Sequence, residues 1–142
     1  MKIAMDSSIF DLYERMLDPN NRQLKKLPSG TRYSSIEQEA FDIIDALENI
    51  HKSGAIFCRL PSNKVVLNLP ECCIKGFDIH KINKRTDELN GPYEDLREEC
   101  KLLAEAEQCG VSIILTRNGN FIKLTGKSDS VKIIKPIDYF KK

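Results

Sequence analysis

Three carboxylates stand where the surrounding residues favour apolar side chains, which makes them candidates for chemistry. Asp6 directly follows the apolar segment 2–5, while Glu39 and Glu99 interrupt the apolar faces of two expected helices. A carboxylate in such a position is costly unless it is paired or holds a cation. If the three side chains converge, the natural occupant is Mg²⁺ or Mn²⁺, a hard cation that takes oxygen ligands. Such ions activate water and stabilise the oxygens of an in-line phosphodiester displacement.

One of these carboxylates, Glu39, also has a structural explanation. For Glu39, an ion pair explains the position as well as a metal ion does, and spacing alone does not separate the two. Asp95 lies one helical turn before Glu99 and could add charge to the same region. Whether Asp6, Glu39 and Glu99 meet depends on the elements that carry them.

The elements expected to position these residues include buried strands that end in polar residues. Residues 111–115 form a near-continuous apolar run of strand length, typical of a strand buried on both faces of a parallel sheet. The polar loop 116–120 follows, just as Asp6 follows residues 2–5. Open α/β sheets place their chemistry at the carboxyl ends of the strands. Asp6 and Asn118 are therefore expected at one edge of the sheet.

Helical periodicity predicts the elements between these strands. The expected helices run from a cap at residues 6–8 to about residue 17, over 36–50, over part of 74–89 and over 93–109. Glu39 falls inside the apolar face of the second of these, and Glu99 near the middle of the apolar arc of the last, whose Glu105 is expected to face away. Further strands are expected at 31–34, 55–58 and 65–67.

Composition limits the classes of protein to consider. The 142 residues are expected to form a single domain, 1–142, and the net charge of +1 argues neither for nor against nucleic acid. We expect no membrane segment and no signal peptide, because no apolar run is long enough. Five cysteines without framework spacing indicate a reducing cytoplasm.

Two local clusters have simpler explanations than a binding site. Adjacent Cys72 and Cys73, with His80 nearby, do not match the usual spacing of zinc ligands, so buried small apolar residues are the favoured interpretation. The basic cluster at 81–85, with Lys81, Lys84 and Arg85, could contact phosphates, but a solvated helix face is the commoner outcome.

Five short segments, spread nearly end to end along the chain, form a recognisable set. They are KIAMDSS (2–8), IEQE (36–39), ECKLLAEA (99–106), TRNGNF (116–121) and VKIIKPIDYF (131–140). Together they resemble the PIN-domain family, which includes metal-dependent ribonucleases such as the VapC-like toxins of toxin–antitoxin pairs and several RNA-processing nucleases. The resemblance implies that 131–140 contains a closing strand and a Pro-led terminal segment.

The resemblance also implies roles for the acidic residues, and this chain departs from the family pattern at several of them. Asp6, Glu39 and Glu99 would hold Mg²⁺ or Mn²⁺, and Asn118 would orient water or substrate. The third acid of the family is usually aspartate, whereas here it is Glu99. Both aspartates of the family's terminal loop are replaced, by Asn118 and Asn120, so the site loses two charges while keeping oxygens that accept hydrogen bonds.

The implied fold is a three-layer α/β/α arrangement with a central, mostly parallel sheet. The leading functional hypothesis is a divalent-metal-dependent ribonuclease acting on single-stranded RNA. The alternative is a PIN-like protein with weakened catalysis that binds RNA or a protein partner, and the third is an unrelated α/β protein with structural carboxylates. An antitoxin-like protein and a second copy of the chain are further partner classes, and the sequence names neither.

Overall fold

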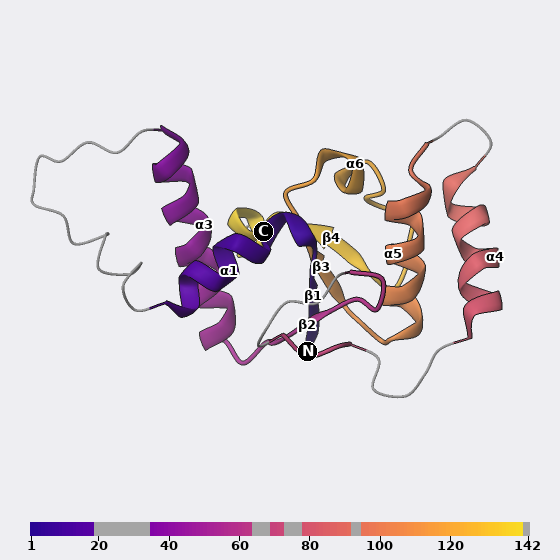
Figure 1. Ribbon diagram of the computed structural model, residues 1–142, viewed down its shortest axis with the longest axis horizontal. Helices are drawn as coiled ribbons and strands as arrows, with labels where there is room; N and C mark the ends of the chain where they lie inside the picture. Colours follow the sequence, from indigo (N-terminus) through magenta and orange to yellow (C-terminus); the bar gives the residue numbers. More distant parts are fainter. Residues whose placement is uncertain (19–34, 64–68, 73–77, 92–94, 141–142) are drawn as a thin grey trace, which may run out of the picture.

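A parallel sheet with helices on both faces forms the body of the molecule (Figure 1). The computed structural model describes residues 1–18, 35–63, 69–72, 78–91 and 95–140. Within them the chain alternates strands and helices, and the sheet has four strands that are all parallel to their neighbours. The sequence prediction of a three-layer α/β/α fold with a central parallel sheet is confirmed.

The sheet is ordered β2-β1-β3-β4. Its strands are β1 (Lys2–Met5), β2 (Ile56–Arg59), β3 (Ile113–Leu115) and β4 (Lys132–Ile134). The two central strands pair in the register Ile3 with Ile113 and Met5 with Leu115. All three residues of β3 are buried, as the apolar run predicts for a strand covered on both faces.

One face of the sheet is covered by α1 (Phe10–Leu17) and α3 (Ser35–Lys52), and a 3-10 turn, η1 (Ser7–Ile9), leads from β1 into α1. Ile3 and Met5 of β1 belong to this layer of the core. Because side chains alternate along a strand, Ala4 points to the other face and belongs to the second layer.

The other face is covered by α5 (Arg97–Gln108), with α4 (Ile79–Asn90) packed against it (Figure 1). A single turn of helix, α6 (Gly119–Ile122), follows β3 on this side and buries Phe121 in the same core layer. The sequence predicts a polar loop here, and α6 was missed. The helix expected within 74–89 begins at Ile79, and the expected strands 31–34 and 65–67 lie outside the described residues.

Glu105 of α5 corrects the predicted orientation of that helix. It was expected to face away from the core, yet its side chain is fully buried. Its Oε1 accepts the backbone N–H of Ser62 at 2.7 Å, because the segment that follows β2 covers this part of α5. Burial raises the pKa of the Glu105 carboxyl above its ordinary value. Helical periodicity could not reveal a loop from elsewhere in the chain that covers the helix.

A disulfide joins Cys58 of β2 to Cys72. Cys72 is buried, as expected, and its sulfur is bonded to that of Cys58, which the sequence does not predict; Cys73 lies outside the described residues. Disulfides are typical of oxidising compartments, so this bond does not support the cytoplasmic location that the cysteine spacing suggests. Among the described residues, no helix is both long and apolar enough to span a membrane.

A candidate site at the carboxyl edge of the sheet

Three neighbouring strands end in polar residues at the same edge of the sheet. Asp6 follows β1, Thr116 follows β3 and Lys135 follows β4. Backbone hydrogen bonds continue the sheet through these positions, with Asp6 N–H donating to Leu115 at 3.0 Å and Thr116 N–H donating to Ile134 at 3.2 Å. The strand ends are therefore held side by side, as the sequence predicts for the carboxyl edge.

Asp6 is the centre of a compact polar network. The residue is 3% exposed, and its Oδ2 accepts hydrogen bonds from Ser8 Oγ and Thr116 Oγ1, both at 2.9 Å. Ser8 N–H also donates to Oδ2, at 3.4 Å, which caps the 3-10 turn that follows β1. A buried carboxylate is thus satisfied by hydroxyl and amide donors from two adjacent strand ends.

Both hydroxyl groups also form hydrogen bonds with the backbone that follows β3. Ser8 Oγ accepts the N–H of Arg117 at 2.9 Å, and Thr116 Oγ1 accepts the N–H of Asn118 at 3.0 Å. Each hydroxyl donates to the carboxylate and accepts from an amide, so the charge of Asp6 fixes the orientation of the loop. We call Asp6, Ser8, Thr116 and these two amides the Asp6 network.

The side chain of Asn118 has a structural role in this loop. Its Oδ1 accepts the N–H of Asn120 at 2.9 Å and so caps α6. The amide oxygen that the sequence assigns to orienting water or substrate is thus engaged with the backbone. Asn120 is exposed at the first turn of α6.

A pocket of about 340 Å³ opens beside the Asp6 network, and we call it the sheet-edge pocket. Its lining residues are Ser8, Glu39, Ile43, Arg117, Lys135, Pro136 and Ile137. Arg117 Nη2 donates to Glu39 Oε1 at 3.3 Å across this pocket. The pocket therefore combines one carboxylate and two cations, and its wall at Ser8 covers the buried carboxylate of Asp6.

Glu39 is not inside an apolar face, which corrects the prediction from helical spacing. Its side chain is 57% exposed and forms the ion pair with Arg117. The first turns of α3 extend past the carboxyl ends of the strands (Figure 1), so a residue on the inner side of the helix faces the pocket there rather than the core. The structural alternative for Glu39, an ion pair, is present.

Glu99, the third predicted ligand, belongs to α5. It is half-buried in the first turn of α5, on the face of the sheet opposite to α3, and it does not line the sheet-edge pocket. Among the described residues, no group of three or more His, Cys, Asp or Glu side chains is placed to hold a metal ion. The donors present therefore fit a largely hydrated Mg²⁺ or Mn²⁺ held through one or two carboxylates, not an ion enclosed by three.

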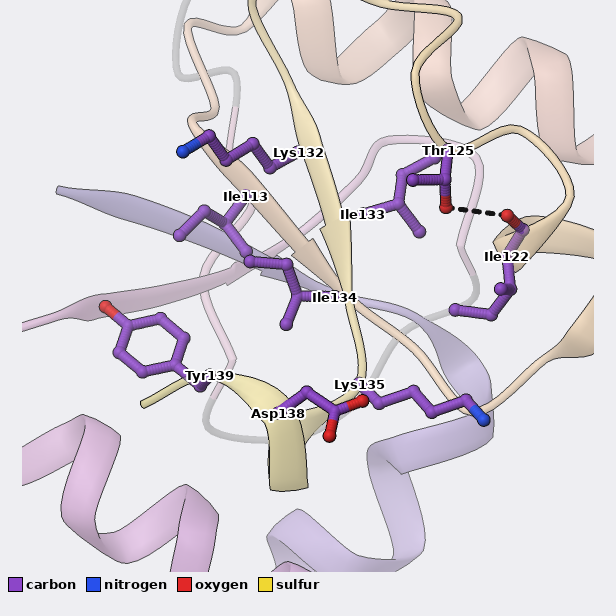
Figure 2. A pocket seen from close by; sticks show the side chains of 9 residues that line it. All are labelled: Ile113, Ile122, Thr125, Lys132, Ile133, Ile134, Lys135, Asp138 and Tyr139. Atoms are coloured by element: carbon purple, nitrogen blue, oxygen red, sulfur yellow. Dashed lines mark hydrogen bonds between the residues drawn. The ribbon is translucent and has the colours of Figure 1, made fainter. Parts of the chain in front are cut away.

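A larger pocket, of about 740 Å³, lies against the outer edge of the sheet at β4 (Figure 2). Isoleucines of β3 and β4 form its floor, while Tyr139 and Asp138 border one side and Thr125 the other. Its charged groups are Lys132, Lys135 and Asp138. Like the sheet-edge pocket, this pocket has one carboxylate and two cations, but none of the described residues that line it belongs to the Asp6 network, so it offers less for catalysis.

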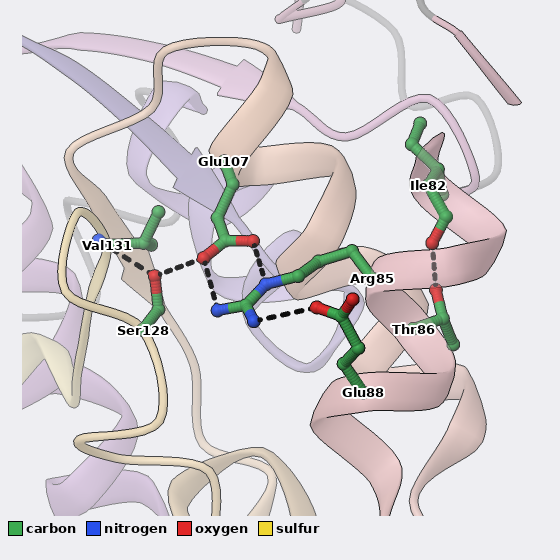
Figure 3. Close-up of polar contacts among 7 residues, drawn as sticks. All are labelled: Ile82, Arg85, Thr86, Glu88, Glu107, Ser128 and Val131. Atoms are coloured by element: carbon green, nitrogen blue, oxygen red, sulfur yellow. Dashed lines mark hydrogen bonds and ion pairs between the residues drawn. The ribbon is translucent and has the colours of Figure 1, made fainter. Parts of the chain in front are cut away.

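The basic cluster of α4 divides into two kinds of residue. Lys81 and Lys84 are exposed, as a solvated helix face would be. Arg85 instead forms a bidentate ion pair with Glu107 of α5, with Nε to Oε1 at 2.8 Å and Nη2 to Oε2 at 3.1 Å (Figure 3). Ser128 Oγ donates to Glu107 Oε2 at 2.7 Å, which ties a third segment to the pair. The guanidinium of Arg85 therefore has a structural role and joins α4 to α5.

Sequence reasoning missed Arg117 and Lys135 as site residues. The available signal was their position, because Arg117 is the second residue after β3 and Lys135 the first after β4. The rule that placed Asp6 and Asn118 at the carboxyl edge applies equally to these cations.

Comparisons of the chain with family models, with curated proteins and with solved structures gave no match. The resemblance to PIN domains therefore rests on the five sequence segments and remains a prediction.

Proposed function

We propose that this protein is a divalent-metal-dependent ribonuclease that cleaves single-stranded RNA, with the sheet-edge pocket as its site. The observation that carries the proposal is the composition of that pocket, where Glu39, Arg117 and Lys135 share one cavity beside the buried carboxylate of Asp6. A phosphodiester substrate needs cations to hold its phosphate, and a metal-dependent reaction needs carboxylates to hold the ion.

Each residue of the pocket has a role in this proposal. Arg117 and Lys135 bind and orient the phosphate, while Asp6 and Glu39 would hold Mg²⁺ or Mn²⁺. When bound, such an ion supplies an activated water and stabilises negative charge on the phosphate oxygens. The hydroxyl of Ser8 lies between Asp6 and the pocket and keeps the carboxylate oriented. Glu99 does not line the sheet-edge pocket and has no role in this proposal.

A second candidate is a PIN-like protein with weakened catalysis that binds RNA or a protein partner. Two observations favour it: Glu39 is paired with Arg117, and the oxygen of Asn118 caps α6. An antitoxin-like partner, a homodimer and a cytoplasmic location stay predictions from the sequence.

A cleavage assay separates the two candidates. The substrate is a mixed-sequence, 5′-labelled single-stranded RNA, incubated with increasing Mn²⁺ or Mg²⁺ and, in parallel, with EDTA. We expect cleavage only with the ion, reduced by at least roughly 10–100-fold in Asp6→Asn, because changes that only touch the ligands of a bound metal already cost that much. Melting curves check that the variant is folded. Metal-independent cleavage, or background-level cleavage at every metal concentration, contradicts the nuclease and favours the binding protein.

A further inference from the structure

We propose that Arg117 is a phosphate-binding residue and that Glu39 occupies its guanidinium until RNA arrives. RNA phosphate and the Glu39 carboxylate would then compete for one cation within the sheet-edge pocket. This inference rests on the proposed function to the extent that the pocket takes RNA, and it deepens that function by naming a specific exchange. It does not depend on cleavage.

The backbone of Arg117 is fixed while its side chain is left accessible. Its N–H donates to Ser8 Oγ, and the next amide donates to Thr116 Oγ1, so the Asp6 network holds the base of the side chain. The guanidinium itself is part of a side chain that is 40% exposed. An anchored backbone with an accessible fork of donors is suited to bind a ligand.

The ion pair between Arg117 and Glu39 is weak enough for a phosphate to replace Glu39. Within the described part of the chain, the guanidinium makes one hydrogen bond, from Nη2 to Glu39 Oε1 at 3.3 Å. Both side chains are well exposed, at 40% and 57%, and exposed ion pairs contribute little to stability. A phosphodiester carries the same single negative charge as a carboxylate, and it can accept two parallel N–H donors from arginine, whereas Glu39 accepts one, so it is the stronger partner.

Lys135 supplies a second cation for the same phosphate. It follows β4 directly, on the strand next to the one that Arg117 follows, and it lines the same pocket. Pro136, which is buried, comes next and begins a 3-10 turn, so the backbone at Lys135 is restrained. Two cations from adjacent strand ends are thus presented to one cavity.

The exchange would couple RNA binding to metal binding. Glu39 is released from Arg117 when phosphate takes its place, and a released carboxylate is available to a divalent ion. By thermodynamic linkage, the ion would in turn strengthen RNA binding by the same factor. In the absence of RNA, Arg117 and the ion compete for Glu39.

The test measures RNA binding without metal, by fluorescence anisotropy of a labelled single-stranded oligoribonucleotide in EDTA at low salt. We expect Arg117→Gln to weaken binding by at least about fivefold and Glu39→Gln to strengthen it by about two- to fivefold, within the usual range of coupling between interacting sites. Lys123→Gln, which removes an exposed cation at the residue that follows α6, outside the pocket, should change affinity by less than about twofold. Melting curves verify that each variant is folded.

Opposite effects of Arg117→Gln and Glu39→Gln are the signature of competition. Wild-type affinity in both variants, equal weakening by Arg117→Gln and Lys123→Gln, or no RNA binding by the wild type would each overturn the inference. The proposed nuclease fails separately, in the cleavage assay, because binding in EDTA requires neither an ion nor a reaction.

Discussion

Glu107 and Asp6 each accept hydrogen bonds from hydroxyl groups, and each has an arginine nearby. The two arrangements differ in the position of the arginine side chain. In the pair between α4 and α5, the guanidinium of Arg85 contacts both oxygens of Glu107, and Ser128 completes the set (Figure 3). In the Asp6 network, Arg117 contributes its backbone N–H through Ser8, and its guanidinium is left at the pocket.

This difference separates a structural network from a candidate binding site. The Glu107 pair joins α4, α5 and the segment before β4 through contacts that use both carboxylate oxygens. Burial by itself would raise the pKa of Glu107, but the hydrogen bonds from Arg85 and Ser128 outweigh it and hold the pKa below its ordinary value. The Asp6 network uses its carboxylate to orient a loop and leaves a cation free to exchange partners. Substitutions in either region test whether the Glu107 pair is structural and the Asp6 network part of a binding site.

The largest effect on stability is expected from Glu107→Gln. The substitution replaces the charged, bidentate partner of Arg85 by a neutral one and leaves only the more exposed carboxylate of Glu88 to pair with it, so the free energy of unfolding should fall by about 2–3 kcal/mol, the upper range for hydrogen bonds to charged groups. Urea denaturation measures the change. Glu98→Gln, at an exposed position of the same helix, is the matched control and should change stability by less than about 0.5 kcal/mol. RNA binding should be unaffected by either variant.

The pH dependence of the stability of Glu107→Gln shows whether the ion pair with Arg85 causes the loss. Because the pKa of Glu107 is lowered on folding, its stabilisation is present above the ordinary carboxyl pKa and is lost as pH falls through the folded value. Glu107→Gln should therefore lose less stability on acidification than the wild type. An identical acid limb in the two proteins would contradict a structural ion pair at this site.

Asn118→Asp tests the other region, because it adds a negative charge at the carboxyl edge of the sheet. Aspartate caps a helix as well as asparagine does, so α6 should keep its cap and the fold should stay intact. The added carboxylate should tighten Mn²⁺ binding by about 1–3 kcal/mol, by analogy with charged hydrogen-bond partners. Calorimetric titration measures the affinity, with Asn118→Ser, another capping residue, as the neutral control. Equal affinity in the two variants would place Asn118 too far from the ion.

A smaller effect is expected at Glu105, a buried carboxyl for which burial outweighs the favourable charge of Lys101. Its Oε2 has no hydrogen-bond partner among the described residues, and burial raises its pKa. Because the folded pKa lies above the unfolded one, stability falls as pH rises between the two values and stays lower above them. Glu105→Gln should remove this penalty and stabilise the protein at neutral pH by about 1 kcal/mol. Thermal melts from acid to neutral pH measure the difference, and a less stable variant at neutral pH would contradict it.

The architecture could be predicted from local patterns because those patterns act over short distances. The apolar runs 2–5 and 111–115 correspond to the two central strands, and the polar residues after them lie at the carboxyl edge. Helical periodicity located α1, α3 and α5 to within a few residues.

The site was harder to predict, because it depends on contacts between distant segments. Glu39 faces the pocket since α3 extends beyond the sheet, and Glu105 is buried since the segment after β2 covers it. Neither fact is encoded in the spacing of apolar residues along one helix. The disulfide between Cys58 and Cys72 likewise requires that a strand and a later loop meet, which cysteine spacing does not reveal.

A metal site at the sheet-edge pocket is tested most directly by the response of the melting temperature to Mn²⁺ in three proteins: wild type, Glu39→Gln and Glu107→Gln. An ion bound at the sheet-edge pocket should raise the melting temperature of the wild type by about 3–6 °C at roughly ten times its Kd. Glu39→Gln should lose this response, whereas Glu107→Gln should start from a lower melting temperature and keep it in full. No shift in the wild type, or an undiminished shift in Glu39→Gln, would contradict a metal site at the carboxyl edge of the sheet.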